Sequence, residues 1–207
     1  MPQFAQGKIV RYGAASRTLP GETATGDRYL IKYEGNSVII AVIDGLGHGQ
    51  EAARAADMAV DAVSRTPTDD LVEIFNETHR QLRQSRGVVM SAIALNPTRG
   101  HISFLAVGNV HGMLVRRNPR ENEPERDFYA LRGGIVGHVL PVLKTTTMNV
   151  RIGDTMVLAT DGLRIDFISD ARIGEPPQAL ADHLLASYAI ESDDALVLAA
   201  RYVGIEG

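Results

Sequence analysis

The sequence predicts an α+β protein in which antiparallel strands form packed sheets and the helices stand in separate groups. Strand-like segments follow one another in a hairpin and a meander, and two helical segments are adjacent in the chain. No regular alternation of strand and helix occurs, as a parallel sheet would require. The length of 207 residues is within the range of one compact domain. We therefore expect residues 1–207 to form a single domain.

The N-terminal part of the chain predicts three strands. Residues 9–19 contain short apolar-polar alternations and end at a Pro-Gly pair. Residues 28–33 and 37–44 flank a Gly-Asn turn dipeptide, so these two segments predict a β-hairpin. The second strand of the hairpin is apolar throughout residues 38–43, which indicates burial on both faces.

Two helices are expected next. Residues 50–65 carry small and apolar side chains at helical spacing, and Pro67 ends that segment. Thr68 and Asp69 are N-cap residue types, and they precede a second periodic segment, residues 71–85. The chain therefore predicts a pair of helices inserted between strands.

The second half of the chain returns to strand patterns and contains a further helix, residues 178–188. A polar segment with two prolines, residues 118–127, predicts an exposed loop. The expected strands are residues 88–95, 101–107, 113–117, 145–150, 155–160 and 195–203.

Composition and charge argue against several classes of protein. The 21 Lys and Arg residues against 25 Asp and Glu give a net charge of −4, without the basic excess of proteins that bind nucleic acids or anionic membranes. The absence of cysteine excludes disulfides, thiolate metal sites and cysteine nucleophiles. Residues 1–11 do not resemble a signal peptide, and no apolar run approaches the ~20 residues of a membrane span. We expect a cytoplasmic protein with no nucleic-acid or membrane partner.

Four short segments each place an aspartate at the edge of a strand. A carboxylate that ends a buried strand is costly to desolvate unless a positive group compensates it. No Lys or Arg adjoins Asp44 or Asp193 in the sequence, and several aspartate oxygens together suit hard cations such as Mg²⁺ or Mn²⁺. The segments therefore predict a metal site. They are Thr25-Gly26-Asp27, residues 42–49 with Asp44, residues 159–162 with Asp161, and residues 192–195 with Asp193 and Asp194.

Other interpretations of these glycines and aspartates are weaker. Residues 45–49 lie between a strand and a helix, as a dinucleotide-binding turn does, but Gln50 stands where that motif requires its third glycine. Asp-Gly and Gly-Asp pairs also form ordinary turns, which we expect at residues 153–154, and we expect residues 69–70 to cap a helix. No Gly-x-Ser-x-Gly elbow occurs, so acyl transfer by a serine is not indicated.

The order of these motifs resembles a known family. Gly26-Asp27, the Asp-Gly-x-Gly-His-Gly run at residues 44–49, residues 107–109, residues 160–162 and the late Asp-Asp pair are arranged as in the metal-dependent phosphatases of the protein phosphatase 2C superfamily. Within it, the chain is similar to the bacterial SpoIIE/RsbU branch, and most of all to RsbX-type stressosome phosphatases. The resemblance extends over about residues 21–202. One departure is Ala195-Leu196, where the family usually has Met-Thr or Leu-Thr.

The resemblance implies two antiparallel sheets flanked by helix pairs, and hydrolysis of phosphoserine or phosphothreonine on proteins with two Mn²⁺ or Mg²⁺ ions. It implies that Asp44 bridges both ions and that the Gly45 carbonyl supports one of them. Asp161 and Asp193 would hold the first ion, and Asp27 would lie near the second. Asp44 and Asp161 are therefore the expected catalytic residues.

Three further residues are expected near the ions. We expect Asp194 beside the ligands rather than among them, because Asp193 matches the family's ligand. His48 either donates a proton to the leaving alkoxide or orients the glycine turn. Arg17 either contacts the substrate phosphate or is exposed to solvent.

The resemblance to RsbX-type enzymes implies a monomeric phosphatase whose partners are phosphorylated STAS-domain proteins of the stressosome. Two alternatives stay open: an RsbU-like phosphatase acting on an anti-anti-sigma factor, and a non-catalytic binding module with the same fold. Partner recognition is expected on the helices within residues 50–85 and on the loop of residues 118–127. Both are predicted to flank or overhang the strands that carry the aspartates.

Overall fold

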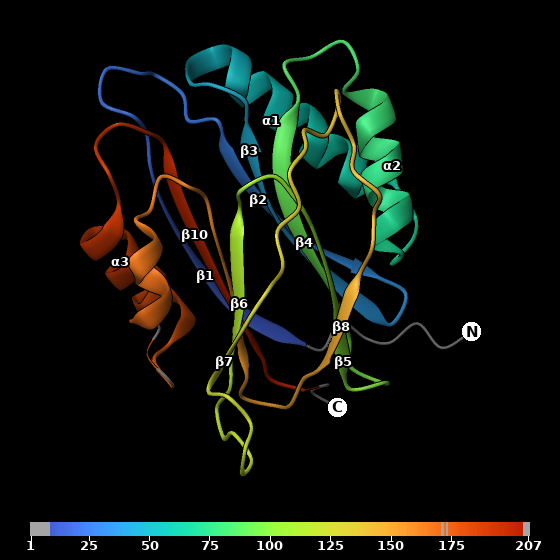
Figure 1. Ribbon diagram of the computed structural model, residues 1–207, viewed down its shortest axis with the longest axis vertical. Helices are drawn as coiled ribbons and strands as arrows, with labels where there is room; N and C mark the ends of the chain where they lie inside the picture. The colour runs from blue at the N-terminus through green and yellow to red at the C-terminus, as the bar shows by residue number, and fades with distance from the viewer. Residues whose placement is uncertain (1–8, 171, 173, 205–207) are drawn as a thin grey trace.

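The computed structural model describes residues 9–170, 172 and 174–204. Two five-stranded antiparallel sheets pack against each other, with α3 on one outer side and α1 and α2 on the other (Figure 1). The arrangement has four layers, helix–sheet–sheet–helix. The predicted α+β class with two packed antiparallel sheets is confirmed.

The first sheet is covered by one α-helix and a short 3-10 helix. Its outer face packs on α3 (Pro177–Tyr188) and η1 (Ile165–Ser169), and buried residues of both helices share a core cluster with the sheet. The sequence predicted α3 but not η1, so the second helical layer is one α-helix with a single 3-10 segment beside it. The strand order is β1 (Val10–Arg17), β10 (Ala195–Tyr202), β9 (Thr155–Ala159), β6 (His111–Val115) and β7 (Arg126–Phe128).

The second sheet is covered by the predicted helix pair, α1 (Gly49–Arg65) and α2 (Leu71–Gln81). The predicted hairpin forms its first two strands, and the two helices connect the second strand to the third. The strand order is β2 (Asp27–Glu34), β3 (Ser37–Gly45), β4 (Val88–Asn96), β5 (His101–Val107) and β8 (Thr146–Asn149).

The apolar second strand of the hairpin lies between two cores. Val38 and Val42 of β3 belong to the cluster between the sheets, whereas Ile39 and Ile43 belong to the cluster beneath α1 and α2. Successive side chains of a strand point to opposite faces, so a strand with a core on each side must be apolar at every position. This confirms the predicted two-sided burial.

The second helix ends four residues before the predicted position. Leu82 is its C-cap, and Ser85 Oγ donates a hydrogen bond to the Leu82 carbonyl (2.8 Å), which closes a turn. At the other end, Asp70 is the N-cap, which confirms the expectation for residues 69–70 at its second position, and its carboxylate accepts from the Val72 backbone N–H (2.8 Å). Across the described part of the chain, the helices are too short or too polar to span a membrane.

Candidate active site

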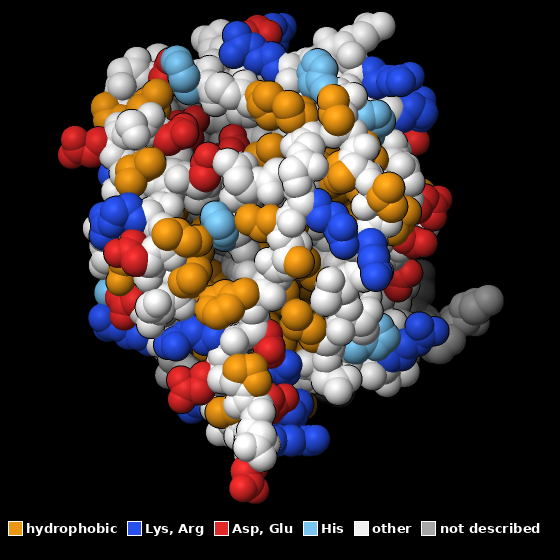
Figure 2. All heavy atoms as spheres, viewed as in Figure 1, with side chains coloured by type: hydrophobic (Ala, Val, Ile, Leu, Met, Phe, Trp, Pro, Cys, Tyr) orange, Lys and Arg blue, Asp and Glu red, His pale blue; other side chains and the backbone are white. Residues whose placement is uncertain are grey.

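The four aspartate segments meet at one end of the two sheets. Asp27 at the start of β2 lies directly opposite Asp44 at the end of β3. Asp161 follows β9, and Asp193 precedes β10 by two residues. Acidic side chains gather around a hollow in the upper part of the face seen in Figure 2. Four segments far apart in the sequence therefore contribute carboxylates to one place.

The hollow contains a cavity of about 370 Å³. Three of the predicted site aspartates and His48 are part of its wall. It is lined by Asp44, Leu46, Gly47, His48, Val89, Asn109, Ile135, Asp161, Ser192 and Asp193.

Asp27 is buried and Asp44 is partly buried, and neither has a positive partner among the described residues. Burial, reinforced by the charges of Asp27 and Asp161, raises the pKa of Asp44 to about 9. Burial likewise raises the pKa of Asp27 to about 7, although the Thr160 hydroxyl donates to its carboxylate (2.8 Å). Among the described residues, no Lys or Arg forms an ion pair with either carboxylate. Only an added cation would hold both of them ionised at neutral pH.

The adjacent residues Asp193 and Asp194 have different environments. Asp193 lines the cavity, and its pKa is raised by burial and by the charge of Asp161. Asp194 is only 4% exposed, and its two carboxylate oxygens accept from the backbone N–H groups of Leu19 and Gly26 (2.7 Å each). Asp194 thus fixes the loop between β1 and β2, and the geometry favours Asp193 as the residue that faces a cation.

Gly45, directly after Asp44, allows α1 to pack closely against the end of β3. A Cβ atom at Gly45 would lie 2.1 Å from the Ala52 carbonyl oxygen of α1. No other residue lets α1 begin directly against the end of β3. The role of the Gly45 carbonyl as a ligand stays a prediction.

The family model for Stage II sporulation protein E (SpoIIE) matches residues 34–203. The chain belongs to the SpoIIE family. It is a metal-dependent serine/threonine protein phosphatase of the protein phosphatase 2C type. The phosphoserine phosphatase RsbX of Bacillus subtilis strain 168 is 25% identical over 176 residues, which cover 84% of this chain and 85% of RsbX.

Solved structures of related proteins have the same fold. One comes from the bacterial stressosome, described as a modular system that has been adapted to control secondary messenger signalling. It is 28% identical to this chain with a TM-score of 0.82, and the match covers 93% of this chain and 99% of the other. RsbX in complex with magnesium is 22% identical with a TM-score of 0.81, covering 97% and 99%. The phosphatase domain of SpoIIE from Bacillus subtilis has a TM-score of 0.76 at 19% identity, covering 96% of this chain and 64% of that one. The predicted family is therefore confirmed.

Two polar residues of this SpoIIE-family site had no predicted role. Asn109 Nδ2 donates to Asp161 Oδ2 (2.6 Å). The Thr160 hydroxyl donates to Asp27 and accepts from the Leu196 backbone N–H (2.9 Å). Both residues stand inside the motifs that carry the resemblance, but only the folded chain shows which carboxylate each one orients.

His48 occupies the N-cap position of α1, but its side chain makes no capping hydrogen bond. Its Nδ1 lies 2.5 Å from Glu22 Oε1 in the loop between β1 and β2. The ring lines the cavity, and its side chain is 60% exposed. Glu22 is thus a partner that the sequence did not indicate.

Two expectations about the surroundings of the site differ from the structure. Arg17 is partly buried, and its Nη2 donates to the Ile190 carbonyl, so it does not line the cavity. The loop of residues 118–127 does not overhang the aspartates, and its last residues form part of β7. Val115, just before that loop, pairs with Thr155 at the start of β9, whereas the site lies beyond the other end of β9. That prediction was wrong because β6 carries the chain away from the site.

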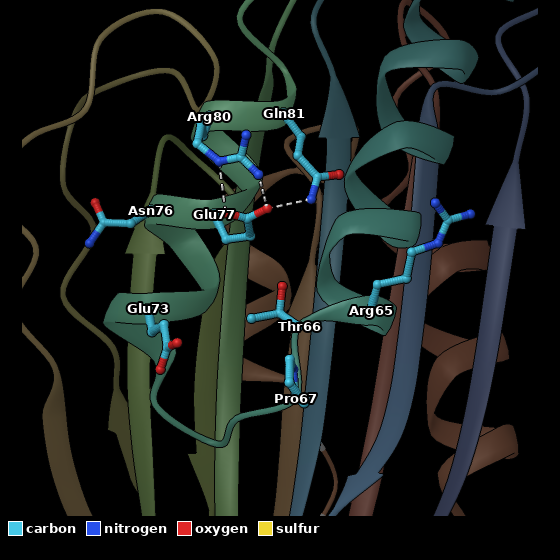
Figure 3. A pocket seen from close by; sticks show the side chains of 8 residues that line it. All are labelled: Arg65, Thr66, Pro67, Glu73, Asn76, Glu77, Arg80 and Gln81. Atoms are coloured by element: carbon cyan, nitrogen blue, oxygen red, sulfur yellow. Dashed lines mark hydrogen bonds and ion pairs between the residues drawn. The ribbon is translucent and has the colours of Figure 1, made fainter.

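A larger cavity, of about 490 Å³, lies between the end of α1 and α2 (Figure 3). Three of its four charged groups, Arg65, Glu77 and Arg80, are already paired, and Glu73 is its one acidic group without a partner among the described residues. Hydrogen bonds from Arg80 and Gln81 lower the pKa of Glu77 to about 2. It holds no group of unpaired carboxylates, so we do not assign the reaction to it.

The acidic residues of the site fit a hard cation by their chemistry. They offer only oxygen donors, and the raised pKa values of Asp44 and Asp27 show the lack of positive charge. Within the described residues, no group of three or more His, Asp or Glu side chains is arranged so that it could hold a metal ion by itself. Mg²⁺ usually keeps several waters and is held by one or two carboxylates, so such a cage is not required.

Proposed function

We propose that this phosphatase removes phosphate from phosphoserine or phosphothreonine on STAS-domain proteins of a stressosome, in the manner of RsbX. Two findings support this proposal. The relative from Bacillus subtilis is a phosphoserine phosphatase, and a structure from the bacterial stressosome matches 93% of the chain. The observation that carries the catalytic part is the group of buried and partly buried carboxylates without an Arg or Lys partner among the described residues.

We propose that these carboxylates hold two Mn²⁺ or Mg²⁺ ions. Asp44 would contact both ions, as the family resemblance implies, and the charges of Asp27 and Asp161 act on it. Asp161 and Asp193 would hold the first ion, the Gly45 carbonyl would support one of the two, and Asp27 would lie near the second. When bound, such ions polarise phosphoryl oxygens and lower the pKa of water.

The remaining residues of the site orient groups and move a proton. Asn109 engages one oxygen of Asp161 and leaves the other oxygen free to face the cavity. The Thr160 hydroxyl likewise engages one oxygen of Asp27, which is buried beside the cavity. Glu22 fixes the ring of His48 through Nδ1, which leaves Nε2 to hold the proton that the leaving serine or threonine oxygen takes up.

A phosphatase assay with and without metal tests the proposal. The purified chain is incubated with a phosphorylated STAS-domain protein in Mn²⁺, and phosphate release is compared with a sample in EDTA. We expect release in Mn²⁺ and none in EDTA. Equal release in EDTA would contradict the metal-dependent mechanism. Release from a phosphorylated anti-anti-sigma factor but not from the stressosome protein would favour the RsbU-like alternative, and no release from any phosphoester would favour a binding module.

A further inference from the structure

Arg86 lies at the rim of the active-site cavity with its charge uncompensated. Its Nη1 is 3.0 Å from the position that a Cβ atom would take at Gly47, and Gly47 lines the cavity. Arg86 is exposed, and it makes no hydrogen bond or ion pair with any residue that the structure describes. Arg17, the arginine expected from the sequence, is instead bound to a backbone carbonyl.

The backbone on both sides of Arg86 is fixed. The Leu46 backbone N–H donates to the Gly87 carbonyl (3.1 Å), and His138 Nε2 lies 3.1 Å from the Ser85 carbonyl oxygen. Val88 and Val136 exchange two backbone hydrogen bonds (3.0 and 2.8 Å). The guanidinium therefore projects from a rigid support that is directly bonded to the loop after Asp44.

Gly47 provides the space for this guanidinium. Its φ is +85°, a conformation that favours glycine, and a Cβ atom at this position would lie 3.0 Å from Arg86 Nη1, so the flexible end of that arginine would have to shift. Glycine at this position thus allows a positive group to lie beside a wall that otherwise carries Asp44, Asp161 and Asp193.

We propose that Arg86 binds the phosphoryl group of the substrate at the rim of the cavity, an inference that rests on the proposed function. A phosphate monoester dianion that approaches three carboxylates needs positive charge along its path as well as at the reacting atoms. A guanidinium can donate two parallel hydrogen bonds to phosphate oxygens, and an unpaired one at the cavity rim is available to do so.

The test compares three variants in two measurements. The variants are Arg86→Ala, Arg86→Lys and, as a matched control, Arg83→Ala, which removes another exposed arginine three residues earlier. Binding of inorganic phosphate is measured by calorimetry in Mg²⁺, and kcat and KM are measured with a small aryl phosphate in Mn²⁺. The melting temperature of each variant is recorded as a check on folding.

We expect Arg86→Ala to weaken phosphate binding and raise KM by about ten- to a hundredfold, the usual cost of a lost hydrogen bond to a charged group. Arg86→Lys should recover only part of this loss, because an ammonium cannot bind in the bidentate mode. Arg83→Ala should behave as the wild type.

Unchanged phosphate binding and KM in Arg86→Ala would overturn the assignment, and so would an equal loss in Arg83→Ala. A wild-type chain that binds phosphate through Arg86 but hydrolyses no phosphoester would instead overturn the proposed function and leave this assignment in place. A wild-type chain that binds no phosphate would overturn the assignment even if it is active.

Discussion

Buried carboxylates lie at both ends of β9, but only one end also holds their counter-charge. Before β9, Asp154 is 1% exposed and accepts from Arg116 Nη1 (3.3 Å) and from the backbone N–H groups of Arg117 (2.9 Å) and Arg151 (3.0 Å). Beyond the other end of β9, Asp44 and its neighbours have no arginine or lysine bound to them among the described residues.

The difference separates a structural aspartate from a functional one. Arg116 is itself 5% exposed and also pairs with Asp127 (2.7 Å), so this end of the sheet is neutralised from within the chain. Breaking a buried pair is strongly destabilising, since it leaves the other charge uncompensated. At the active-site end, the missing charge has to come from an ion, which can be added or removed in solution. The two ends should therefore respond oppositely to the same substitution.

The largest expected effect follows from Asp44→Asn. Removal of the central carboxylate should lower kcat on an aryl phosphate in Mn²⁺ by about 10³-fold or more, because metal ions contribute several kcal/mol to such reactions. The melting temperature in EDTA should stay at the wild-type value, because asparagine has the shape and charge of the protonated aspartate. Both quantities are measured on the same preparation. A variant that unfolds would show that Asp44 is a structural turn residue.

The next effect is expected at the other end, from Asp154→Asn. Here the free energy of unfolding should fall by about 3 kcal/mol, at the lower end of the range for a broken buried pair because Asp127 still pairs with Arg116. Urea denaturation checks this value. Activity at low temperature, where the variant is folded, should remain near the wild-type value. Loss of activity without loss of stability would contradict the division into a structural and a functional end.

The fold was largely predictable because its signals are local. The continuous apolar run of β3, the Gly-Asn turn before it and the alanine-rich spacing of α1 depend on residues close together in the sequence. The short helix η1 was missed, since its burial of Phe167 depends on α3, which follows later in the chain. The end of α2 was misplaced because a side-chain hydrogen bond of Ser85 closes the turn.

The aspartates of the site were predictable as a group, because each ends or precedes a buried strand and the motifs follow the order of a family. Their partners were not. Asn109 bonds to Asp161 across 52 positions of the chain, and Thr160 bonds to Asp27 across 133. Gly153-Asp154 was assigned as a turn, which is correct, but the pairing with Arg116 appears only when β6 and β9 lie side by side. Long-range register decides these contacts, and no local pattern records it.

The smallest effect is expected from shortening the loop between Pro119 and Glu125. Its anchor is Glu123, which pairs with Arg151 and accepts from the Arg120 backbone N–H (2.9 Å), all at the end of the sheets remote from the aspartates. Five residues of β9 separate the two ends, about 16 Å at the usual rise of a strand. Shortening should therefore lower the melting temperature by less than Asp154→Asn does.

Shortening this loop should also leave kcat/KM unchanged, both on an aryl phosphate and on the phosphorylated STAS-domain partner. Parallel assays on the two substrates distinguish the outcomes. A selective loss on the protein substrate would mean that the partner extends along the whole length of the sheets and contacts both ends. An equal loss on both substrates would mean that the arginine cluster supports the geometry of the aspartates through β9, and that the two ends are coupled. No loss on either substrate would leave recognition to surfaces at the active-site end, where α1 begins and Arg86 stands.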